Sequence, residues 1–193
     1  SEQTTKQDPR DGRWAGVRRW YVNGQGQTMV ILDPAELGGS LLDHHFAICS
    51  HEVTAAEFRR FRPKHRQQES IAPSDDCPAN SVSWYDAAEY CNWLSEQEGI
   101  DKNQWVYEPN DNGQYADGMK IKRNALELMG YRLPTEAEWE FACRAGCSGT
   151  YAFGEPVPLL DNYAQYILKS AGLSRSVGSL LPNAYGLFDM HGN

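Results

Sequence analysis

An α+β domain is the fold class that the sequence predicts, and three observations predict it. Three short segments carry the capping signals of helix starts, and several short runs of β-branched and aliphatic residues are typical of strands. The connections between them are long and rich in Gly, Pro and Asn. Because helices and strands do not alternate regularly, the pattern favours α+β over a parallel α/β sheet. Long connections in a compact domain are usually functional or held by another group, such as a metal ion.

Four short segments are predicted as strands. Thr28–Leu32 and Phe46–Cys49 are runs of aliphatic, β-branched and aromatic residues, which are typical of strands. Residues 105–107 and 119–121 are predicted to pair as a hairpin. The turn-rich stretch 109–113 would link them, although the connection is longer than a tight turn.

Three helix starts have the sequence of a capping box, in which a Ser or Thr caps the helix and an acidic residue three positions later bonds back. The pairs are Thr54 with Glu57, Ser83 with Asp86, and Thr135 with Glu138. Gly99 and Gly146 are predicted to end the second and third helices. After residue 147 the sequence predicts no helix, only an irregular segment that neighbouring parts must hold in place.

Several prominent side chains around these helices are predicted to be structural. Trp84, Trp93 and Trp139 are expected to be core anchors. Arg132 precedes the third helix and is expected to pair with an acidic residue rather than to act in catalysis. Glu138 lies in the first turn of that helix, where the helix dipole favours a negative charge, so acid–base chemistry is not needed to explain it.

The chain of 193 residues fits one domain, with residues 1–20 predicted as a polar lead-in or linker and residues 21–193 as the domain. The net charge of −8 argues against general nucleic-acid binding, which needs a basic face. A basic cluster at residues 59–66 has two interpretations, a solvated helix end or a patch that binds a polyanion.

Three further features of the composition indicate the compartment. No stretch approaches the ~18 apolar residues of a membrane span, so no membrane partner is expected. No signal peptide is visible, and an odd number of cysteines, five, does not indicate a disulfide framework. A reducing, cytoplasmic setting is therefore predicted.

Four motifs occur in order along the chain. They are HEVTAAEF at residues 51–58, NSVSWYDA with YCNWLS at 80–95, GYRLPTEAEWE at 130–140 and PNAYGLFDMHGN at 182–193. Together they resemble the formylglycine-generating enzyme, or sulfatase-modifying factor, family. The resemblance implies a variant of the C-type lectin fold and extends from about residue 28 to residue 193.

The resemblance also implies a chemistry. Catalytic members of the family convert a substrate cysteine to formylglycine with molecular oxygen and a copper ion held by two cysteines. Those cysteines follow the motif in which this sequence stops, so none of the five cysteines here is assigned to the pair, and copper is expected only if a C-terminal continuation carries it. The domain over 21–193 is therefore expected to lack its C-terminal part, and that missing segment is the expected partner of this chain.

The family also binds calcium through oxygen ligands. By motif, the resemblance places Asn162 and the carbonyl of Tyr163 at the start of one calcium site. Asp189 and the carbonyl of Gly192 fall at the start of a second. The acidic ligand expected about a dozen residues after the first pair has no match in residues 167–177. A simpler role for Asp189 is a turn residue that bonds its own backbone.

Two functions remain open, and a third is remote. The segment 32–40 and Ala55 depart from the family's usual sequence and resemble its branch fused to bacterial signalling and defence proteins. The first hypothesis is therefore a non-catalytic module that binds a ligand or another protein. The alternative is a fragment of a copper-dependent formylglycine-generating oxidase. A relative that uses iron would need a histidine-rich bundle, which His44, His45 and His51 are too few to supply.

Overall fold

The computed structural model describes residues 20–37, 42–155, 157–166 and 172–193. The predicted lead-in lies outside the described residues except for Trp20, which begins the first strand. The strands are β1 Trp20–Val22, β2 Thr28–Leu32, β3 Phe46–Cys49, β4 Tyr107–Glu108 and β5 Lys120–Ile121. The α-helices are α1 Pro34–Leu37, α2 Ala55–Phe61, α3 Trp84–Gln97 and α4 Glu136–Arg144, and the 3-10 turns are η2 Lys102–Gln104, η3 Ala125–Glu127 and η4 Val157–Asn162.

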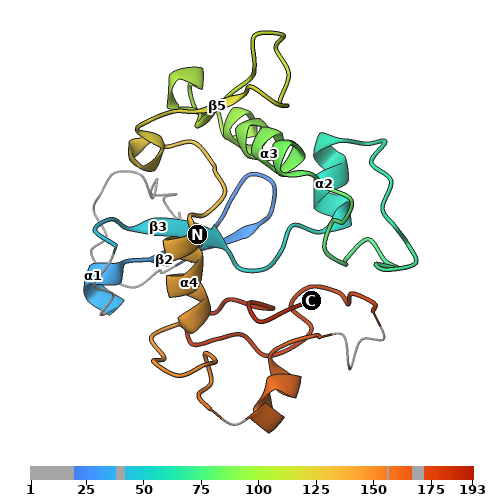
Figure 1. Cartoon of the computed structure of the whole chain (residues 1–193), viewed down its shortest axis with the longest axis vertical. Coiled ribbons are helices and arrows are strands. Elements are labelled where there is room, and N and C mark those ends of the chain that lie inside the picture. Colours follow the sequence, from blue (N-terminus) through green and yellow to red (C-terminus); the bar gives the residue numbers. More distant parts are fainter. Residues whose placement is uncertain (1–19, 38–41, 156, 167–171) are drawn as a thin grey trace, which may run out of the picture.

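The central sheet has three antiparallel strands in the order β1-β2-β3. Figure 1 shows it between the helical part that contains α2 and α3 and the irregular C-terminal segment. The strands predicted at Thr28–Leu32 and Phe46–Cys49 are confirmed to the residue. The sequence analysis did not identify β1, because a run of three residues is too short to show the alternation typical of a strand.

The core behind this sheet joins α4 and the C-terminal segment to the strands. Val30 and Leu32 on β2 form one buried cluster with Ala142 on α4 and Leu187 near the C-terminal end. Phe46 on β3 packs against the same cluster. The irregular segment after residue 147 is therefore held by burial of its apolar side chains on the sheet, as the sequence predicted.

All three predicted capping boxes are confirmed. In each helix, the side chain of the capping residue accepts from the third backbone N–H, and the acidic residue there bonds back to the cap. The second helix stops before Gly99, which has a φ of +69°. The third helix ends at Ala145, which is left-handed with a φ of +48°, and Gly146 follows with a φ of +81°. Gly146 therefore continues the predicted helix end rather than making it alone.

The prediction that three tryptophans are core anchors is wrong for two of them. Trp84 and Trp139 each remain 46% exposed, whereas Trp93 is half-buried beside Phe61 and Tyr90. Trp84 is the first residue of α3, and its ring contacts those of Tyr85 and Tyr107 edge-on. On α4, the small side chain of Ala142 packs in the cluster with Val30 and Leu32, whereas Trp139 is not among the residues packed there and stays exposed.

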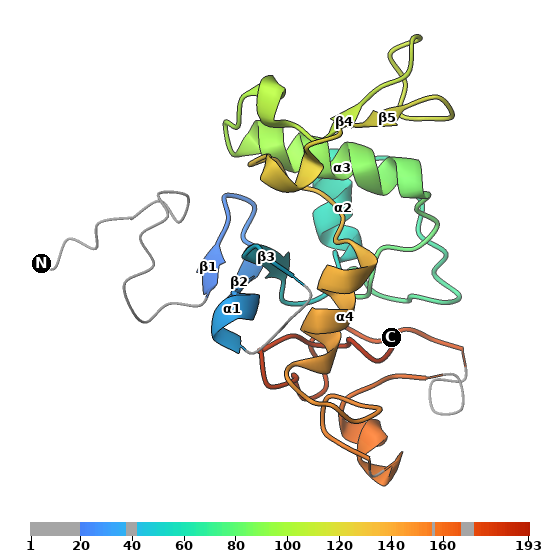
Figure 2. The ribbon, with the colours of Figure 1, turned by 60° about the vertical axis from the view of Figure 1, so that its left-hand side comes forward.

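The predicted hairpin forms, displaced by one or two residues. Tyr107 pairs with Ile121 and Glu108 with Lys120, while Trp105 belongs to the preceding turn. In Figures 1 and 2 the loop that joins β4 and β5 stands out from the body of the protein, beyond α3.

Candidate functional site

Asn162 and Tyr163, the first predicted calcium pair, lie at the end of η4. The carbonyl of Asn162 accepts from the Leu181 N–H at 2.8 Å, so it ties η4 to the C-terminal segment. The ring of Tyr163 stacks on Phe153, with ring centroids 4.5 Å apart. The carbonyl oxygen of Asn162 therefore already has a structural hydrogen bond, although a carbonyl oxygen has a second lone pair for another partner.

Asp189 and Gly192, the second predicted pair, lie in the last turn. Asp189 is only 7% exposed, and its carboxylate accepts from the Gly178 N–H at 2.7 Å. Asp189 itself is left-handed, with a φ of +58°, as a turn residue can be. The Gly192 carbonyl accepts from the Gln165 N–H at 2.8 Å, which brings the last turn against the segment that follows the first pair.

Glu52 is a neighbour of Asp189 that the sequence analysis missed. Burial, with a smaller contribution from the adjacent Asp189 carboxyl, raises the pKa of Glu52 to about 7. Burial also raises the pKa of Asp189. One carboxylate oxygen of Glu52 is buried without a hydrogen-bond partner. Two neighbouring carboxyls with an orphaned oxygen fit a hard cation such as Ca²⁺ better than the predicted residues do alone. The only sequence signal was its place in the HEVT motif.

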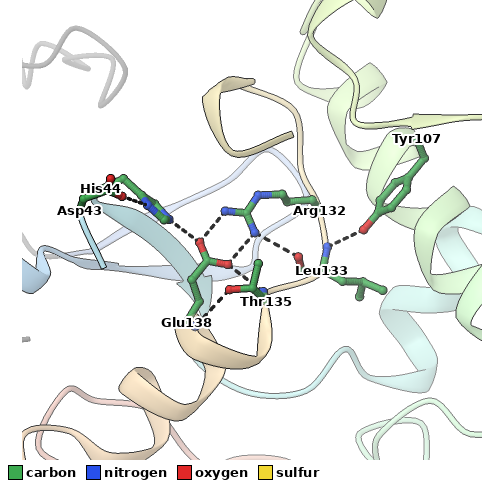
Figure 3. Close-up of polar contacts among 7 residues, drawn as sticks. All are labelled: Asp43, His44, Tyr107, Arg132, Leu133, Thr135 and Glu138. Atoms are coloured by element: carbon green, nitrogen blue, oxygen red, sulfur yellow. Dashed lines mark hydrogen bonds and ion pairs between the residues drawn. The ribbon is translucent and has the colours of Figure 1, made fainter. Parts of the chain in front are cut away.

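Arg132 and Glu138 form a buried ion pair at the start of α4 (Figure 3), which confirms that Arg132 pairs with an acidic residue. The guanidinium donates from Nη1 to Oε2 at 2.6 Å and from Nη2 to Oε1 at 2.5 Å. The Thr135 N–H also donates to Oε2, at 2.8 Å. Burial alone would raise the pKa of Glu138, but its hydrogen bonds with Arg132, Thr135 and His44 outweigh burial and lower it to about 2.

His44 joins this centre from the segment that leads into β3. Its Nε2 lies 2.9 Å from Oε1 of Glu138, and its Nδ1 lies 3.1 Å from Oδ1 of Asp43. The hydrogen bond with Glu138 raises the pKa of His44, although partial burial acts in the opposite direction. His44, Arg132 and Glu138 together connect the segment before β3, the loop before α4 and the first turn of α4.

The basic cluster at residues 59–66 lies at the C-terminal end of α2, whose last turn carries Arg59 and Arg60, so the structure supports the helix-end interpretation. Arg59 pairs with Asp75, Arg60 donates to the carbonyl of Gln25, and Arg62 pairs with both Asp86 and Glu89. Three of its cations therefore tie α2 to neighbouring segments rather than form a free patch.

Cys143 and His191 form a contact that resembles a catalytic dyad, but its hydrogen bonds exclude that role. The Nε2 atom of His191 accepts from the Ala152 N–H at 3.1 Å, so a neutral imidazole carries its proton on Nδ1. That Nδ1 lies 3.7 Å from the sulfur of Cys143, and the thiol donates to the Met190 carbonyl at 3.4 Å. An Nδ1 that already carries a proton cannot accept the thiol proton. Burial raises the pKa of Cys143 and lowers that of His191, which favours the neutral forms of both groups.

The cysteines of the chain are free thiols, and the environments of three of them disfavour the thiolate. Burial raises the pKa of Cys49 to about 11 and that of Cys91 to about 12, in addition to that of Cys143. Within the described ranges, no group of three or more His, Cys, Asp and Glu side chains is placed to hold a metal ion.

The loop at residues 109–118 is exposed over most of its length, yet it is ordered by its own hydrogen bonds. The side chain of Asn110 accepts from the N–H groups of Asn112 and Gln114 and donates to the Asp117 carbonyl at 2.9 Å. Tyr115 fixes the loop to the body, because its hydroxyl accepts from the buried Asn92 amide at 2.8 Å.

Two exposed apolar side chains lie at the base of this loop. The ring of Trp84 packs edge-on against Tyr107, with centroids 5.7 Å apart, and Tyr107 pairs across the hairpin with Ile121. Trp84 and Ile121 are 46% and 53% exposed. We call Trp84, Ile121 and residues 109–118 together the hairpin surface. It combines two exposed apolar side chains with an exposed loop that is ordered by its own hydrogen bonds.

A three-stranded sheet, helices with capping boxes and an irregular C-terminal segment define the class: a small α+β domain whose polar groups mainly hold the chain together. Residues 39–193 match the family model of the sulfatase-modifying factor enzyme 1-like domain, and the chain belongs to this family. The predicted family is thereby confirmed.

The chain is similar to parts of several longer proteins that have different names. The chain is 32% identical over 143 residues to the chaperone protein LppX of Paenibacillus barcinonensis, a match that covers 62% of this chain and 50% of LppX. It is 40% identical over 90 residues to the formylglycine-generating enzyme of Mycobacterium tuberculosis, covering 41% of this chain and 29% of that enzyme. It is 41% identical over 68 residues to the serine/threonine-protein kinase pkn1 of Chlamydia pneumoniae, covering 35% and 10%. The matched parts thus span half or less of these relatives.

The fold is shared with a solved structure, Treponema denticola variable protein 1. The TM-score is 0.71 at 22% identity, and the match covers 90% of this chain and 73% of that one. This similarity and the family membership confirm the predicted fold class, an α+β domain of the C-type-lectin-like type found in formylglycine-generating enzymes. In the part of the chain that the structure describes, no helix is both long and apolar enough to cross a lipid bilayer.

Proposed function

We propose that this chain is a non-catalytic binding module on the formylglycine-generating-enzyme fold, that its partner is another protein, and that it acts within a larger cytoplasmic bacterial protein of signalling or defence. The observation that carries the proposal is the hairpin surface. Tryptophan is enriched among the side chains that dominate binding energy at interfaces, and the indole of Trp84 is exposed there. Because Asn110 already orders the loop, binding would cost less conformational entropy than with a flexible loop.

The roles of the reactive side chains support binding over catalysis. Arg132 and Glu138 bind each other in a buried ion pair. The Cys143 thiol donates to the Met190 carbonyl, and the Nδ1 atom of the neighbouring His191 carries a proton, so it cannot accept the thiol proton. The similarity of part of the chain to a serine/threonine-protein kinase supports a signalling context.

A formylglycine-generating oxidase is the second candidate, and the 40% identity to the Mycobacterium tuberculosis enzyme favours it. In that case copper would be held by a cysteine pair in a C-terminal continuation, because none of the five cysteines here is assigned to one. That continuation would also be the first partner of this chain. The chemistry would then belong to the completed domain.

Calcium is proposed as the cation of the C-terminal segment. Asp189 and Glu52 would supply carboxylate oxygens, and the carbonyl of Gly192 lies in the same turn. Asn162 and Tyr163 would supply oxygens to a separate site. Calcium should raise the melting temperature of the protein. Asp189→Asn should reduce this increase, because it removes a carboxylate from the site at Asp189 and Gly192.

One experiment separates the two candidate functions. The natural gene product is incubated with copper, oxygen and a cysteine-containing sulfatase peptide, and the aldehyde product is measured by hydrazide labelling. The module predicts no aldehyde. Sustained aldehyde formation would establish the oxidase instead.

A second experiment tests the hairpin surface. A photo-reactive amino acid replaces Asn112 in the exposed loop, and cross-linked proteins are identified in cells of the source organism. Trp84→Ala and Ile121→Ala should each reduce the cross-linked product at least tenfold, as expected for interface anchors. Val157→Ala, at an apolar residue that is 61% exposed on η4, is the matched control and should leave the product unchanged. Equal loss in all three variants would count against this surface.

A further inference from the structure

The contacts of His44 differ from those of an ordinary surface histidine, because both ring nitrogens face carboxylate oxygens. Nε2 lies 2.9 Å from Glu138 and Nδ1 lies 3.1 Å from Asp43. A carboxylate can only accept, and a neutral imidazole has only one N–H to donate. Both contacts are therefore hydrogen bonds only when the ring carries two protons and a positive charge.

Deprotonation removes one of the two contacts whichever nitrogen keeps its proton. If Nε2 keeps it, the bond to Glu138 remains and Nδ1 faces the Asp43 carboxylate with a lone pair. If Nδ1 keeps it, the lone pair of Nε2 faces the buried Glu138 carboxylate, whose side chain is 0% exposed. The second arrangement is the costlier, because repulsion is stronger away from water.

Among the described residues, three charged groups face His44. Glu138 comes from α4, Arg132 from the loop before α4, and Asp43 from the segment of His44 itself. The two carboxylates attract a protonated ring, whereas the Arg132 guanidinium disfavours it. On the β3 side, the neighbour of the ring is Phe46, which is uncharged and lies with its centroid 6.3 Å away. The attraction therefore comes from two different segments of the chain.

We infer that His44 is a pH-sensitive latch: its protonated form holds the segment leading into β3 to the start of α4 by a charge-assisted bond to Glu138 and also bonds Asp43, whereas its neutral form keeps only a weaker, neutral bond to Glu138. The latch is defined as the two contacts of His44, with Asp43 and with Glu138. The Arg132–Glu138 pair persists in both states, because it has two hydrogen bonds of its own. The change should therefore be confined to residues 42–47, while the Arg132–Glu138 pair keeps the start of α4 in place.

The direction of the pH effect follows from linkage. His44 has a raised pKa in the folded protein, so its contribution to stability is complete below the ordinary histidine pKa of 6.5 and is lost as the pH rises through the folded value. Each unit of the increase corresponds to about a tenfold weakening of the latch on deprotonation.

The test is an NMR titration of the ring of His44 in the whole protein, with Asp43→Asn and Glu138→Gln as variants. We expect His44 to titrate above a histidine in an unstructured peptide. Each variant should lower that value, and Glu138→Gln should lower it more because its carboxylate is buried. If Glu138→Gln does not fold, Asp43→Asn still tests the latch, because it changes only a fully exposed carboxylate.

A second readout separates the latch from a merely structural histidine. Hydrogen exchange at the amides of residues 45–47, corrected for the intrinsic pH dependence, should accelerate as the pH rises through the His44 titration in the native protein. His44→Gln, which can still donate to Glu138 but cannot be charged, should show no such step. A titration of His44 at or below the peptide value, or an identical exchange step in His44→Gln, overturns the inference.

Discussion

The guanidinium of Arg132 and the carboxylate of Glu138 meet in a two-point contact at 2.5 and 2.6 Å, six residues apart in the sequence. Glu138 is at the same time the acidic member of the capping box that begins α4. One carboxylate therefore fixes both the start of the helix and the loop that precedes it. This double use explains why Glu138, unlike Glu140 on the same helix, is fully buried.

Removal of the Glu138 charge should be strongly destabilising. Glu138→Gln leaves the Arg132 guanidinium without its anion in a poorly solvated place, which typically costs about 3–5 kcal/mol in the free energy of unfolding. Denaturant unfolding of the variant and the native protein measures this cost. Glu140→Gln is the matched control, because Glu140 pairs with Arg144 in solvent, and it should change stability by less than about 0.5 kcal/mol. Equal effects of the two changes would contradict the assigned role.

The same pair should make the protein sensitive to acid. The pKa of Glu138 lies at about 2 in the folded state, below its ordinary value of 4.5. The stability that the carboxylate contributes is therefore complete above pH 4.5 and is lost as the pH falls through that value toward 2. The stability difference between the native protein and Glu138→Gln should shrink steadily over this interval. A difference that stays constant from pH 6 to pH 2.5 would show that Glu138 does not titrate with a lowered pKa.

The fixation of the loop at residues 109–118 can be tested at Asn92 and Tyr115. The Asn92 amide donates to the Tyr107 carbonyl at 2.7 Å and to the Tyr115 hydroxyl at 2.8 Å. Tyr115→Phe removes only the second bond and should cost about 1 kcal/mol, whereas Asn92→Ala removes both and should cost about 2–3 kcal/mol. Thermal unfolding ranks the two variants. Hydrogen exchange at the loop amides should accelerate in Tyr115→Phe while the amides of β2 stay protected.

The local parts of this fold could be predicted from the sequence, because they depend on neighbouring residues. The capping box of Thr54 and Glu57 needs only four consecutive positions, and β2 is a continuous run of β-branched and aliphatic residues. The exposure of Trp84 and Trp139 could not be predicted, because helical spacing shows which residues share a face but not how far the partner surface extends.

The candidate site shows the same limit. The acidic partner of Arg132 was expected, but the participation of His44, 94 residues away from Glu138, depends on how β3 is placed against α4. The approach of Glu52 to Asp189 likewise joins residues far apart in the sequence. A single sequence does not show which distant residues lie close together in space, unless a known motif already associates the two positions.

Gly130, the first residue of the GYRLPTEAEWE motif, should not tolerate even one added methyl group. A Cβ atom at this position would lie 2.5 Å from the Gln104 carbonyl oxygen and 3.1 Å from the Trp105 Cα, and both are backbone atoms that cannot turn aside. The Gly130 N–H donates to the same Gln104 carbonyl at 3.0 Å, so any shift that relieves the clash also weakens this bond. Gly130→Ala should therefore lower the free energy of unfolding by about 1–3 kcal/mol, the usual cost of forcing extra volume into a packed site.

The matched control is Gly113→Ala in the exposed loop. A Cβ there meets nothing within 4 Å and only the positive φ of +73° is unfavourable, so a cost of about 1 kcal/mol is expected. Denaturant unfolding of both variants decides the matter. A smaller loss at Gly130 than at Gly113 would show that the η2 turn can move away from the motif, and that Gly130 is not required there for close backbone contact.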